Sequence, residues 1–298
     1  MTTLSDQIPL NLASSMSARR RWKDRLATAW LYGSLVVALV PLGLVLFYVV
    51  TKGLALFGIS FLTSDIPVSR FNLGPGMAPA IVGTVLITGM AALIAIPLGV
   101  LGAIYINEYG ARRRFAAIIR FLSQVMTGVP SIVMGLFVYT IWIIALGQQA
   151  AGFAGSLALA CLMLPIVIRS SEEMLKLVPD DLRQASYALG NRKWRTIMTV
   201  VLPSAIAGIT SGAMLAVARA AGETAPLLFT IGITYRVNPN LFSGSNTALS
   251  YQIFHNATIG FPGPQDRAWG AALTLIIIVF ILTVAARWVS SRFAVRHS

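Results

Sequence analysis

The sequence predicts an all-α integral membrane protein with six transmembrane helices, and three observations support this fold class. Hydrophobic residues form 56% of the 298 residues and charged residues only 11%, whereas soluble domains carry about 25% charged residues. The mean hydropathy is +0.77. Apolar runs of about 20 residues, enough to cross a hydrocarbon core roughly 30 Å thick, recur along the chain. A water-soluble domain is therefore excluded.

Six apolar runs are the expected spans. The first, Leu26–Thr51, follows a basic segment, but it is too long for a signal-peptide core and lacks an A-x-A cleavage site, so it is expected to be retained. The others are Ala78–Asn107, Phe121–Leu146, Gly152–Ile168, a run from after Pro203 to near Ile233, and Ala268–Ala286.

Prolines and small residues mark the interiors of these spans. Each proline removes a helical hydrogen bond, which a membrane helix tolerates only where protein or water covers the backbone. These prolines are Pro97, Pro130, Pro165 and Pro226. Several small residues between Gly83 and Gly102 allow close helix packing. Such features are typical of a bundle of membrane helices but do not by themselves indicate transport.

The basic residues predict the orientation in the membrane. With a cytoplasmic N-terminus, the inner segments 19–25, 112–120, 169–195 and 287–296 hold 18 of the 23 Lys and Arg residues, and the outer segments hold 4. Lys and Arg gather on the cytoplasmic side of membrane proteins, so both termini are expected to be cytoplasmic. This pattern explains the net charge of +13 without a nucleic-acid partner.

This topology divides the chain into three regions. Residues 1–28 form a cytoplasmic segment, residues 29–290 the six-helix transmembrane domain, and residues 291–298 a cytoplasmic tail. The basic and amphipathic stretch Ala18–Trp30 is either an interfacial elbow helix or only topology-setting charge. The longest loops are expected inside at 169–203 and outside at 236–267.

The inner loop carries the first functional signal. A helix is expected to start at Pro179-Asp180-Asp181, because early acidic residues suit the positive end of a helix, and to end or bend at Gly190. The segment combines charge with apolar residues such as Leu182 and Trp194. Such a helix either docks into a groove of another protein or is a solvated connector.

The same loop resembles the signature of the membrane subunits of ABC importers, which is EAA, three residues, G, nine residues and I-x-LP. Gln184-Ala185-Ser186, Gly190 and Val200-Val201-Leu202-Pro203 match its spacing, with Gln184 in place of Glu and Ser186 in place of Ala. The resemblance implies a MetI-like fold. It also implies that these residues form coupling helices, which insert into a cleft of an ATP-hydrolysing subunit.

Three further stretches, Pro97–Gly110, Gly128–Leu136 and Ala218–Thr230, resemble the phosphate-specific, PstA-type permeases. The resemblance covers roughly residues 30–290 and implies one permease subunit of an ATP-driven phosphate importer in the bacterial cytoplasmic (inner) membrane. The partners that it implies are a PstC-type permease, a dimeric PstB-type ATPase, a PstS-type phosphate-binding protein, phosphate and membrane lipid.

Arg219 and Glu223 are the strongest candidates for an anion site. Arg219 is expected near the middle of one apolar helix, roughly Ile209–Ile231, where a charge costs on the order of 3 kcal/mol and must face the bundle or a wet cavity. Glu223 lies one helical turn on and can pair with it, and Gly222 leaves space. The pair either locks helix packing or binds phosphate, whose oxygens match a guanidinium.

One arginine cannot balance a divalent phosphate, so a second subunit should supply another cation. Thr224, beside Glu223, and Gln124 and Ser131 of the third span are further candidate pathway residues, although polar groups in spans also serve helix–helix hydrogen bonding. The outer loop 236–267 either docks a binding protein or packs over the helix ends.

No catalytic motif competes with transport. The sequence has no G-x-x-x-x-G-K motif, so ATP and magnesium are expected on the partner ATPase, with no cofactor or metal on this chain. Two other functions remain open. One is import of a different oxyanion, and the other is a proton-coupled carrier in which Arg219 and Glu223 relay charge. The signature loop argues against the carrier.

Overall fold

A computed structural model describes residues 18–69, 71, 74–110 and 113–293. Within these residues the regular structure is helical throughout, with no β-strand. The chain divides into two compact units, residues 1–50 and 51–298. Most of the expected N-terminal segment lies outside the described residues. Of the expected tail 291–298, the first three residues continue the last helix and the others lie outside the described part.

The first unit consists of most of helix α1 (Ala18–Gly53), a single helix of 36 residues. The stretch Ala18–Trp30 is continuous with the first span, so the described residues contain no separate elbow helix. The physical reason is local: Arg, Lys, Leu and Ala favour helix, and neither Gly nor Pro occurs from Ala18 to Tyr32.

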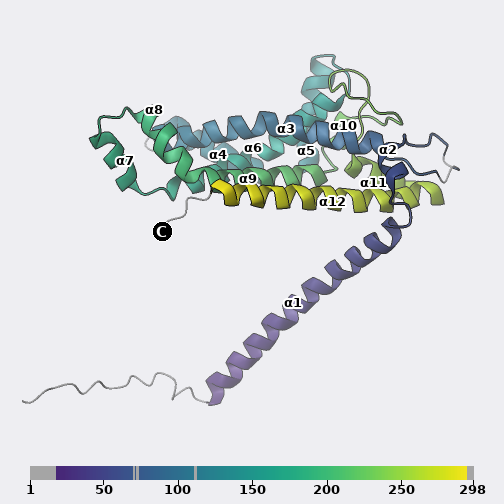
Figure 1. Ribbon diagram of the computed structural model, residues 1–298, viewed down its shortest axis with the longest axis horizontal. Coiled ribbons are helices and arrows are strands. Elements are labelled where there is room, and N and C mark those ends of the chain that lie inside the picture. Colours follow the sequence, from purple (N-terminus) through teal and green to yellow (C-terminus); the bar gives the residue numbers. More distant parts are fainter. Residues whose placement is uncertain (1–17, 70, 72–73, 111–112, 294–298) are drawn as a thin grey trace, which may run out of the picture. The chain divides into compact units, whose positions relative to one another are not determined.

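Four long helices form the bundle of the second unit (Figure 1). They are α3 (Ala78–Ile104), α6 (Gly152–Lys176), α9 (Leu202–Gly222) and α12 (Pro262–Phe293). α6 packs against α3 and α9, and α12 packs against α9. The core between them is rich in small side chains, which allow close approach of the helices; it includes Ile87, Ala91, Ala95, Leu159, Met163, Ala216 and Ala220.

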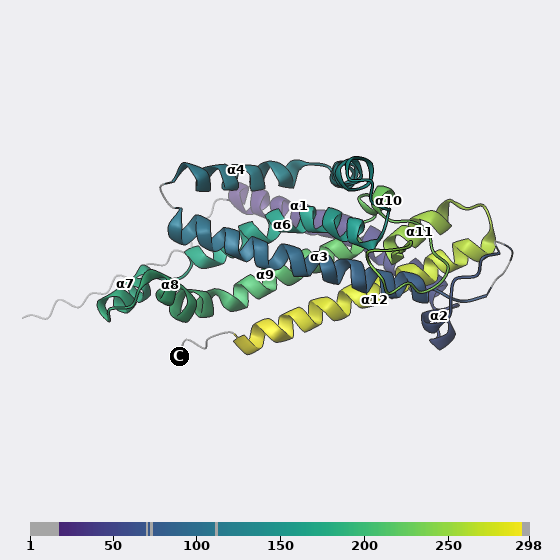
Figure 2. The ribbon, with the colours of Figure 1, turned by 90° about the horizontal axis from the view of Figure 1, so that it is seen from above.

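The two ends of this bundle carry different short elements (Figures 1 and 2). At one end, here called the α7 end, lie α7 (Asp180–Ala188) and α8 (Lys193–Thr196), which connect α6 to α9. At the opposite end, the α11 end, lie α2 (Ile59–Thr63) and α11 (Leu249–Thr258). Figure 1 also places the last turns of α12 toward the α7 end.

Among the described residues, five helices are long and apolar enough to cross a membrane, and a bent pair makes a sixth crossing if it counts as one span. The bent pair occupies the third expected span, Phe121–Leu146, and its bend falls at Pro130, one of the prolines expected to interrupt the spans. α4 (Arg114–Gly128) meets the segment 131–145, which contains α5 (Ser131–Val138), at an angle of 109°. Pro130 lacks an N–H and disfavours a helical conformation at Val129, whose backbone is extended.

Two expected boundaries also differ. Arg169–Lys176 forms the last turns of α6 rather than loop, and α12 begins at Pro262 rather than Ala268. Pro203 lies at the start of α9 and follows the π-helical turn η3 (Ile197–Val201), so the chain is helical from α8 into α9. Proline has no backbone N–H to donate to the preceding turn, and the wider π-helical turn there accommodates this missing hydrogen bond.

The loop preceding α11 packs over the helix ends. A Cβ atom on Gly83 would lie 1.9 Å from the carbonyl oxygen of Thr247. The hydroxyl of Thr84 accepts a hydrogen bond from the Leu249 N–H at 2.8 Å, and Asn246 Oδ1 accepts one from the Gly152 N–H at 2.8 Å. This favours the packing interpretation for the buried part of the 236–267 loop, while docking of a binding protein stays a prediction.

The positive-inside pattern predicts that the α7 end faces the cytoplasm. Asp181 and Ser243 are exposed at opposite ends of the chain fold and suit single-cysteine labelling in a Cys161→Ala background. A membrane-impermeant thiol reagent added to spheroplasts should modify Ser243→Cys and leave Asp181→Cys unmodified until the cells are lysed. Labelling of Asp181→Cys in intact spheroplasts would contradict this orientation.

Candidate substrate pathway and coupling surface

The helix that carries Arg219 ends directly after it. α9 stops at Gly222, Glu223 is extended with φ −71° and ψ 128°, and the short helix α10 (Leu227–Thr230) starts after Pro226. The helix expected over roughly Ile209–Ile231, with a break at Pro226, thus already ends at Gly222, so Arg219 lies near its end and not near its middle. Gly222 is a poor helix former and Pro226 removes a backbone donor, so the two residues together end the helix.

Arg219 lies in the last turn of α9, where a cation suits the negative end of the helix dipole. Its Nε lies 3.5 Å from Glu223 Oε1, and the two side chains are 70% and 21% exposed. The ion pair expected from the four-residue spacing is thus present. Of the two surroundings expected for Arg219, the bundle interior and a wet cavity, the first is therefore not what this chain provides.

Arg219 belongs to an exposed stripe on α9. Ser211, Leu215, Arg219 and Gly222 are all exposed and follow each other at helical spacing, whereas the opposite face, which includes Ala216 and Ala220, is buried. A stripe that contains a guanidinium is costly against lipid. This face is therefore suited to a wet pathway or to another protein surface.

Helix α11 holds the break between α9 and α10. The Ser250 hydroxyl donates a hydrogen bond to the carbonyl oxygen of Glu223 at 3.0 Å. The Thr224 hydroxyl donates to the Ser250 carbonyl oxygen at 3.5 Å. A Cβ atom on Gly222 would meet nothing within 4 Å. The backbone beside Glu223 is therefore fixed, while the space beside Gly222 is open, as the sequence predicted.

The second broken helix meets this break. A Cβ atom on Gly135 of α5 would lie 2.6 Å from both Cα and the carbonyl oxygen of Pro226. Half-buried Ser131 begins α5, one turn before Gly135, so this candidate lies on an element that contacts the break. Gln124 does not: it lies in α4, before the bend.

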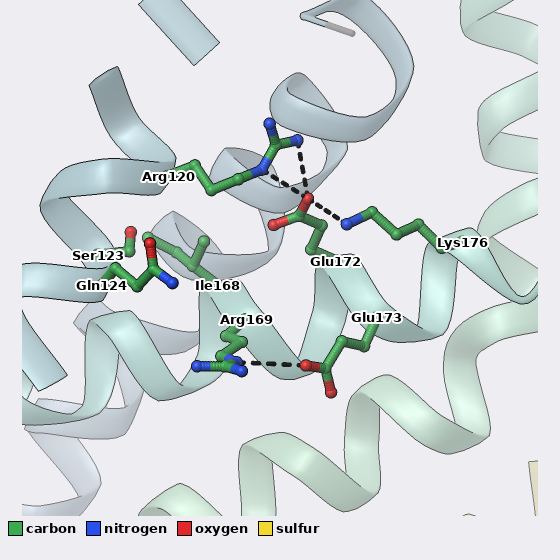
Figure 3. A pocket seen from close by; sticks show the side chains of 8 residues that line it. All are labelled: Arg120, Ser123, Gln124, Ile168, Arg169, Glu172, Glu173 and Lys176. Atoms are coloured by element: carbon green, nitrogen blue, oxygen red, sulfur yellow. Dashed lines mark hydrogen bonds and ion pairs between the residues drawn. The ribbon is translucent and has the colours of Figure 1, made fainter. Parts of the chain in front are cut away.

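Gln124 instead lines a pocket of about 180 Å³ between α4 and α6 (Figure 3). Glu172 Oε1 accepts hydrogen bonds from Arg120 Nε at 2.9 Å and Nη2 at 2.8 Å, and it lies 2.6 Å from Lys176 Nζ. The side chain of Glu172 is only 8% exposed. This carboxylate therefore ties the first half of the broken span to α6.

The opposite side of the same pocket carries an ion pair within α6. Arg169 Nε lies 3.2 Å from Glu173 Oε1, and both side chains are more than half exposed (Figure 3). Exposed pairs of this spacing contribute little to stability, about 0.3–0.5 kcal/mol. The pocket thus contains an interhelical ion pair whose carboxylate is buried and a local ion pair that is exposed.

The predicted coupling segment forms a helix with a defined end. Gly190 has φ +79°, its N–H donates to the Tyr187 carbonyl oxygen at 2.9 Å, and the Asn191 N–H donates to the Ser186 carbonyl oxygen at 3.2 Å. These two bonds form a Schellman motif, which places a left-handed residue directly after the helix. The expected end of the helix near Gly190 is confirmed.

Large apolar side chains before and after α7 are exposed in the described part of the chain. Leu189 is 83% exposed, Leu177 73% and Trp194 60%. Gln184 and Ala185 are also exposed on α7. Clustered exposed apolar residues of this kind mark interaction surfaces. The geometry therefore suits docking better than a solvated connector.

The remaining signature residues have internal contacts. Ser186 is buried, and its hydroxyl shares a hydrogen bond of 2.9 Å with Thr196, so it ties α7 to α8 rather than facing outward. Leu202 packs against the buried cluster that contains Leu175 and Val201, while Pro203 is exposed. Ser186 thus differs from the outward-facing coupling residue suggested by the resemblance, because a hydroxyl finds a partner in α8.

Sequence reasoning missed the ion pair between Arg183 Nη2 and Glu108 Oε1, which are 3.0 Å apart and nearly buried. Glu108 is an isolated acid at the end of an apolar run, and Arg183 directly precedes the signature. An isolated acidic residue beside an apolar run is a signal that it has a basic partner. The sequence does not indicate, however, that Glu108 and Arg183 lie close together.

Comparison with known proteins gives consistent matches. Residues 95–295 match the family described as "Binding-protein-dependent transport system inner membrane component". The chain is 43% identical over 282 residues to the "Phosphate transport system permease protein PstA 1" of Mycobacterium tuberculosis (strain CDC 1551 / Oshkosh), covering 93% of this chain and 92% of that protein. It is 41% identical to the PstA protein of Yersinia pestis, covering 91% and 90% of the two chains.

Solved structures share the fold at low sequence identity. A chain of the bacterial alginate ABC transporter in complex with an alginate pentasaccharide-bound periplasmic protein matches with a TM-score of 0.67 and 14% identity, covering 91% of this chain and 96% of that chain. A chain of the inward-facing MetNI methionine ABC transporter matches with a TM-score of 0.58 and 17% identity, covering 72% and 93%. The expected MetI-like fold is thus confirmed.

The contact between the two broken helices predicts a strict size limit at Gly135. Gly135→Ala should destabilise the protein by about 1–3 kcal/mol, because the new methyl group meets backbone atoms of Pro226 that cannot move aside. The measurement is the thermal unfolding midpoint in detergent. Gly128→Ala is the matched control, since a Cβ atom there meets nothing within 4 Å. Equal midpoints for the two variants would contradict the contact.

Proposed function

The chain belongs to the PstA-type phosphate transport system permeases, within the family of binding-protein-dependent transport system inner membrane components, and from this membership we propose that it forms half of the translocation pathway of an ATP-driven phosphate importer. It is a multi-pass membrane permease subunit and not an enzyme. We further propose that it works in the bacterial cytoplasmic membrane beside a PstC-type permease, above a dimeric PstB-type ATPase, and that a PstS-type protein delivers phosphate.

The observation that carries this proposal is the exposed guanidinium of Arg219 at the end of an interrupted apolar helix. A charge on a face that lipid would cover is unfavourable by about 3 kcal/mol. Water or a second permease must therefore cover the stripe that contains it. A pathway lined by the two permeases would place both water and a protein surface against this stripe.

The loose ion pair suits transient anion binding. Arg219 and Glu223 touch at 3.5 Å, and most of the guanidinium is exposed, so its remaining N–H groups can bind phosphate oxygens in the planar, two-pronged geometry that arginine favours. Glu223 either orients this fork or gates it. Because Arg219 and Glu223 together are neutral, the PstC-type subunit is expected to contribute the cation that balances a divalent phosphate.

Thr224, Gly222 and Ser131 complete the proposed pathway. Thr224 and Gly222 belong to the break itself, and Ser131 begins the helix that packs against the break at Gly135. Gln124 is proposed to lie further along the pathway, at the pocket beside Arg120 and Glu172.

The α7 end is proposed to dock on the ATPase. Leu182, Leu189 and Trp194 offer apolar groups, and Gln184 with Ala185 offers the exposed face of α7. A short helix that presents anchors to a groove is a common recognition mode. Gly190 fixes the direction of this surface, because its left-handed conformation sets the path of the chain from α7 to α8.

Uptake by vesicles that contain the whole complex tests the function. Labelled phosphate should enter only when ATP is supplied, and excess unlabelled phosphate should compete better than sulfate. Uptake without ATP, driven by a pH gradient, would instead favour a proton-coupled carrier. Stronger competition by sulfate would favour an importer of another oxyanion.

Arg219→Gln is expected to leave the complex assembled and to abolish ATP-driven phosphate uptake, because it keeps a polar side chain but removes the charge. Arg219→Lys should restore uptake poorly, since an ammonium group does not offer the planar fork. Glu223→Gln should be milder if Glu223 only orients Arg219, and severe if it gates. An assembled Arg219→Gln complex with near-normal uptake would show instead that the pair serves helix packing.

Gly190→Leu is expected to uncouple the complex while the transmembrane helices still insert. The left-handed φ disfavours any side chain by roughly 1–2 kcal/mol, although the surrounding space is open. The exposed turn, rather than the core, should therefore change. Co-purification of the ATPase and uptake per assembled complex are the measurements. Normal values for both would contradict the docking proposal.

A further inference from the structure

We propose that Arg183 and Glu108 are positioning residues that join the coupling helix α7 to the end of α3, so that movement of α7 reaches the transmembrane bundle through this ion pair. The inference rests on the proposed docking of α7 on an ATPase. It assigns a route for the coupling rather than another contact with the ATPase, because both side chains are nearly buried.

Arg183 is the centre of a set of hydrogen bonds at the α7 end. Its Nη1 donates to the carbonyl oxygen of Val178 at 2.6 Å and to Asp180 Oδ1 at 2.9 Å. Its Nη2 donates to the carbonyl oxygen of Leu175 at 2.9 Å and to Glu108 Oε1 at 3.0 Å. Three of these acceptors lie on the same stretch of chain as α7, and only Glu108 lies on another part of the bundle.

Glu108 belongs to the π-helical turn η1 (Tyr105–Tyr109), which continues α3. Its side chain is 5% exposed and that of Arg183 is 13% exposed. The amide of Asn107 donates to the same carboxylate oxygen at 2.8 Å. Lys193 Nζ donates to the backbone carbonyl of Glu108 and lies 4.9 Å from the centre of the Tyr109 ring. Arg183 of α7 and Lys193 of α8 therefore both contact η1.

The geometry gives the ion pair a mechanical role beyond stability. α6 leads into α7 through the short connection 177–179, in which Val178 is buried. A nearly buried charge pair also resists separation, because parting it leaves an unpaired charge away from water. A shift of α7 therefore carries η1 and α3 with it. Since α3 packs extensively on α6, the shift reaches the centre of the bundle.

The two alternatives for Arg183 differ in what the loss of Glu108 would do. If Arg183 only caps the end of α6, its bonds to the Leu175 and Val178 carbonyl oxygens suffice, and the carboxylate of Glu108 is dispensable for transport. If the pair joins α7 to α3, removing the carboxylate should loosen α7 even though those two bonds remain. Glu108→Gln separates the alternatives, because it keeps the size of the side chain and removes its charge.

The test uses the complete complex, purified through a tag on the ATPase so that only assembled complexes count. Glu108→Gln should retain ATP hydrolysis but reduce phosphate uptake per ATP by about fivefold or more. The control is Asp24→Asn, which removes an exposed carboxylate from α1, a helix that holds none of the proposed pathway residues, and should keep the wild-type ratio. A wild-type ratio in Glu108→Gln would overturn the inference.

A second readout does not depend on transport. Spin labels at Leu101→Cys on α3 and Asp181→Cys on α7, both exposed positions in a Cys161→Ala background, report the distance between the two helices. The distance distribution should broaden in Glu108→Gln and not in Asp24→Asn. An unchanged distribution would also overturn the inference.

Two outcomes remain to be separated. If Glu108→Gln yields no complex, Glu108→Asp decides, since it keeps the charge but shortens the side chain and so draws the carboxylate away from Arg183 Nη2. A normal uptake ratio and a narrow distance distribution would overturn the inference. If the wild-type complex itself shows no ATP-driven uptake, the proposed function fails and the coupling role fails with it. Normal wild-type uptake with an unaffected Glu108→Gln overturns the ion-pair role alone.

Discussion

The rest of the structure depends on the rule that backbone N–H and C=O groups inside a membrane must find partners within the protein or in water. Two apolar helices in the described part of this chain are nevertheless broken, and two other elements cover the break between α9 and α10. Gly135 of α5 contacts Pro226 backbone to backbone, and Ser250 supplies a hydroxyl to the carbonyl of Glu223. The irregular backbone beside Arg219 is tolerated because neighbouring helices complete its bonding, and this leaves a charged side chain at a fixed place.

The ion pairs of the chain differ in a way that matches two kinds of role. Arg219 and Glu223 are held 3.5 Å apart with the guanidinium largely exposed, which suits an anion that must bind and leave. Arg183 and Glu108 are nearly buried, with further hydrogen bonds on each side, which suits a permanent joint. Removing one partner of a buried ion pair destabilises a protein strongly, whereas the intact pair adds little net stability. Such pairs therefore fix the positions of the elements that they join more than they stabilise the fold.

Sequence patterns predicted the parts of this molecule that local chemistry determines. Apolar runs gave five uninterrupted spans, and Gly190 in the signature loop marked the end of α7. Patterns failed where distant segments decide. Pro130 bends one span sharply while Pro97 remains inside a regular helix, although each proline removes a helical hydrogen bond. The contact of Arg183 with Glu108 joins residues 75 positions apart, and no local period encodes it.

The exposed stripe on α9 also bears on how such a complex is made. On the proposed pairing, a copy of this chain that has not met its PstC-type partner presents Arg219 to lipid, at a cost of about 3 kcal/mol, which corresponds to roughly a hundredfold in an equilibrium. Orphan copies are then disfavoured relative to paired ones before any chaperone or protease acts on them. The same side chain that is proposed to meet the substrate would thus enforce equal numbers of the two permeases during biogenesis.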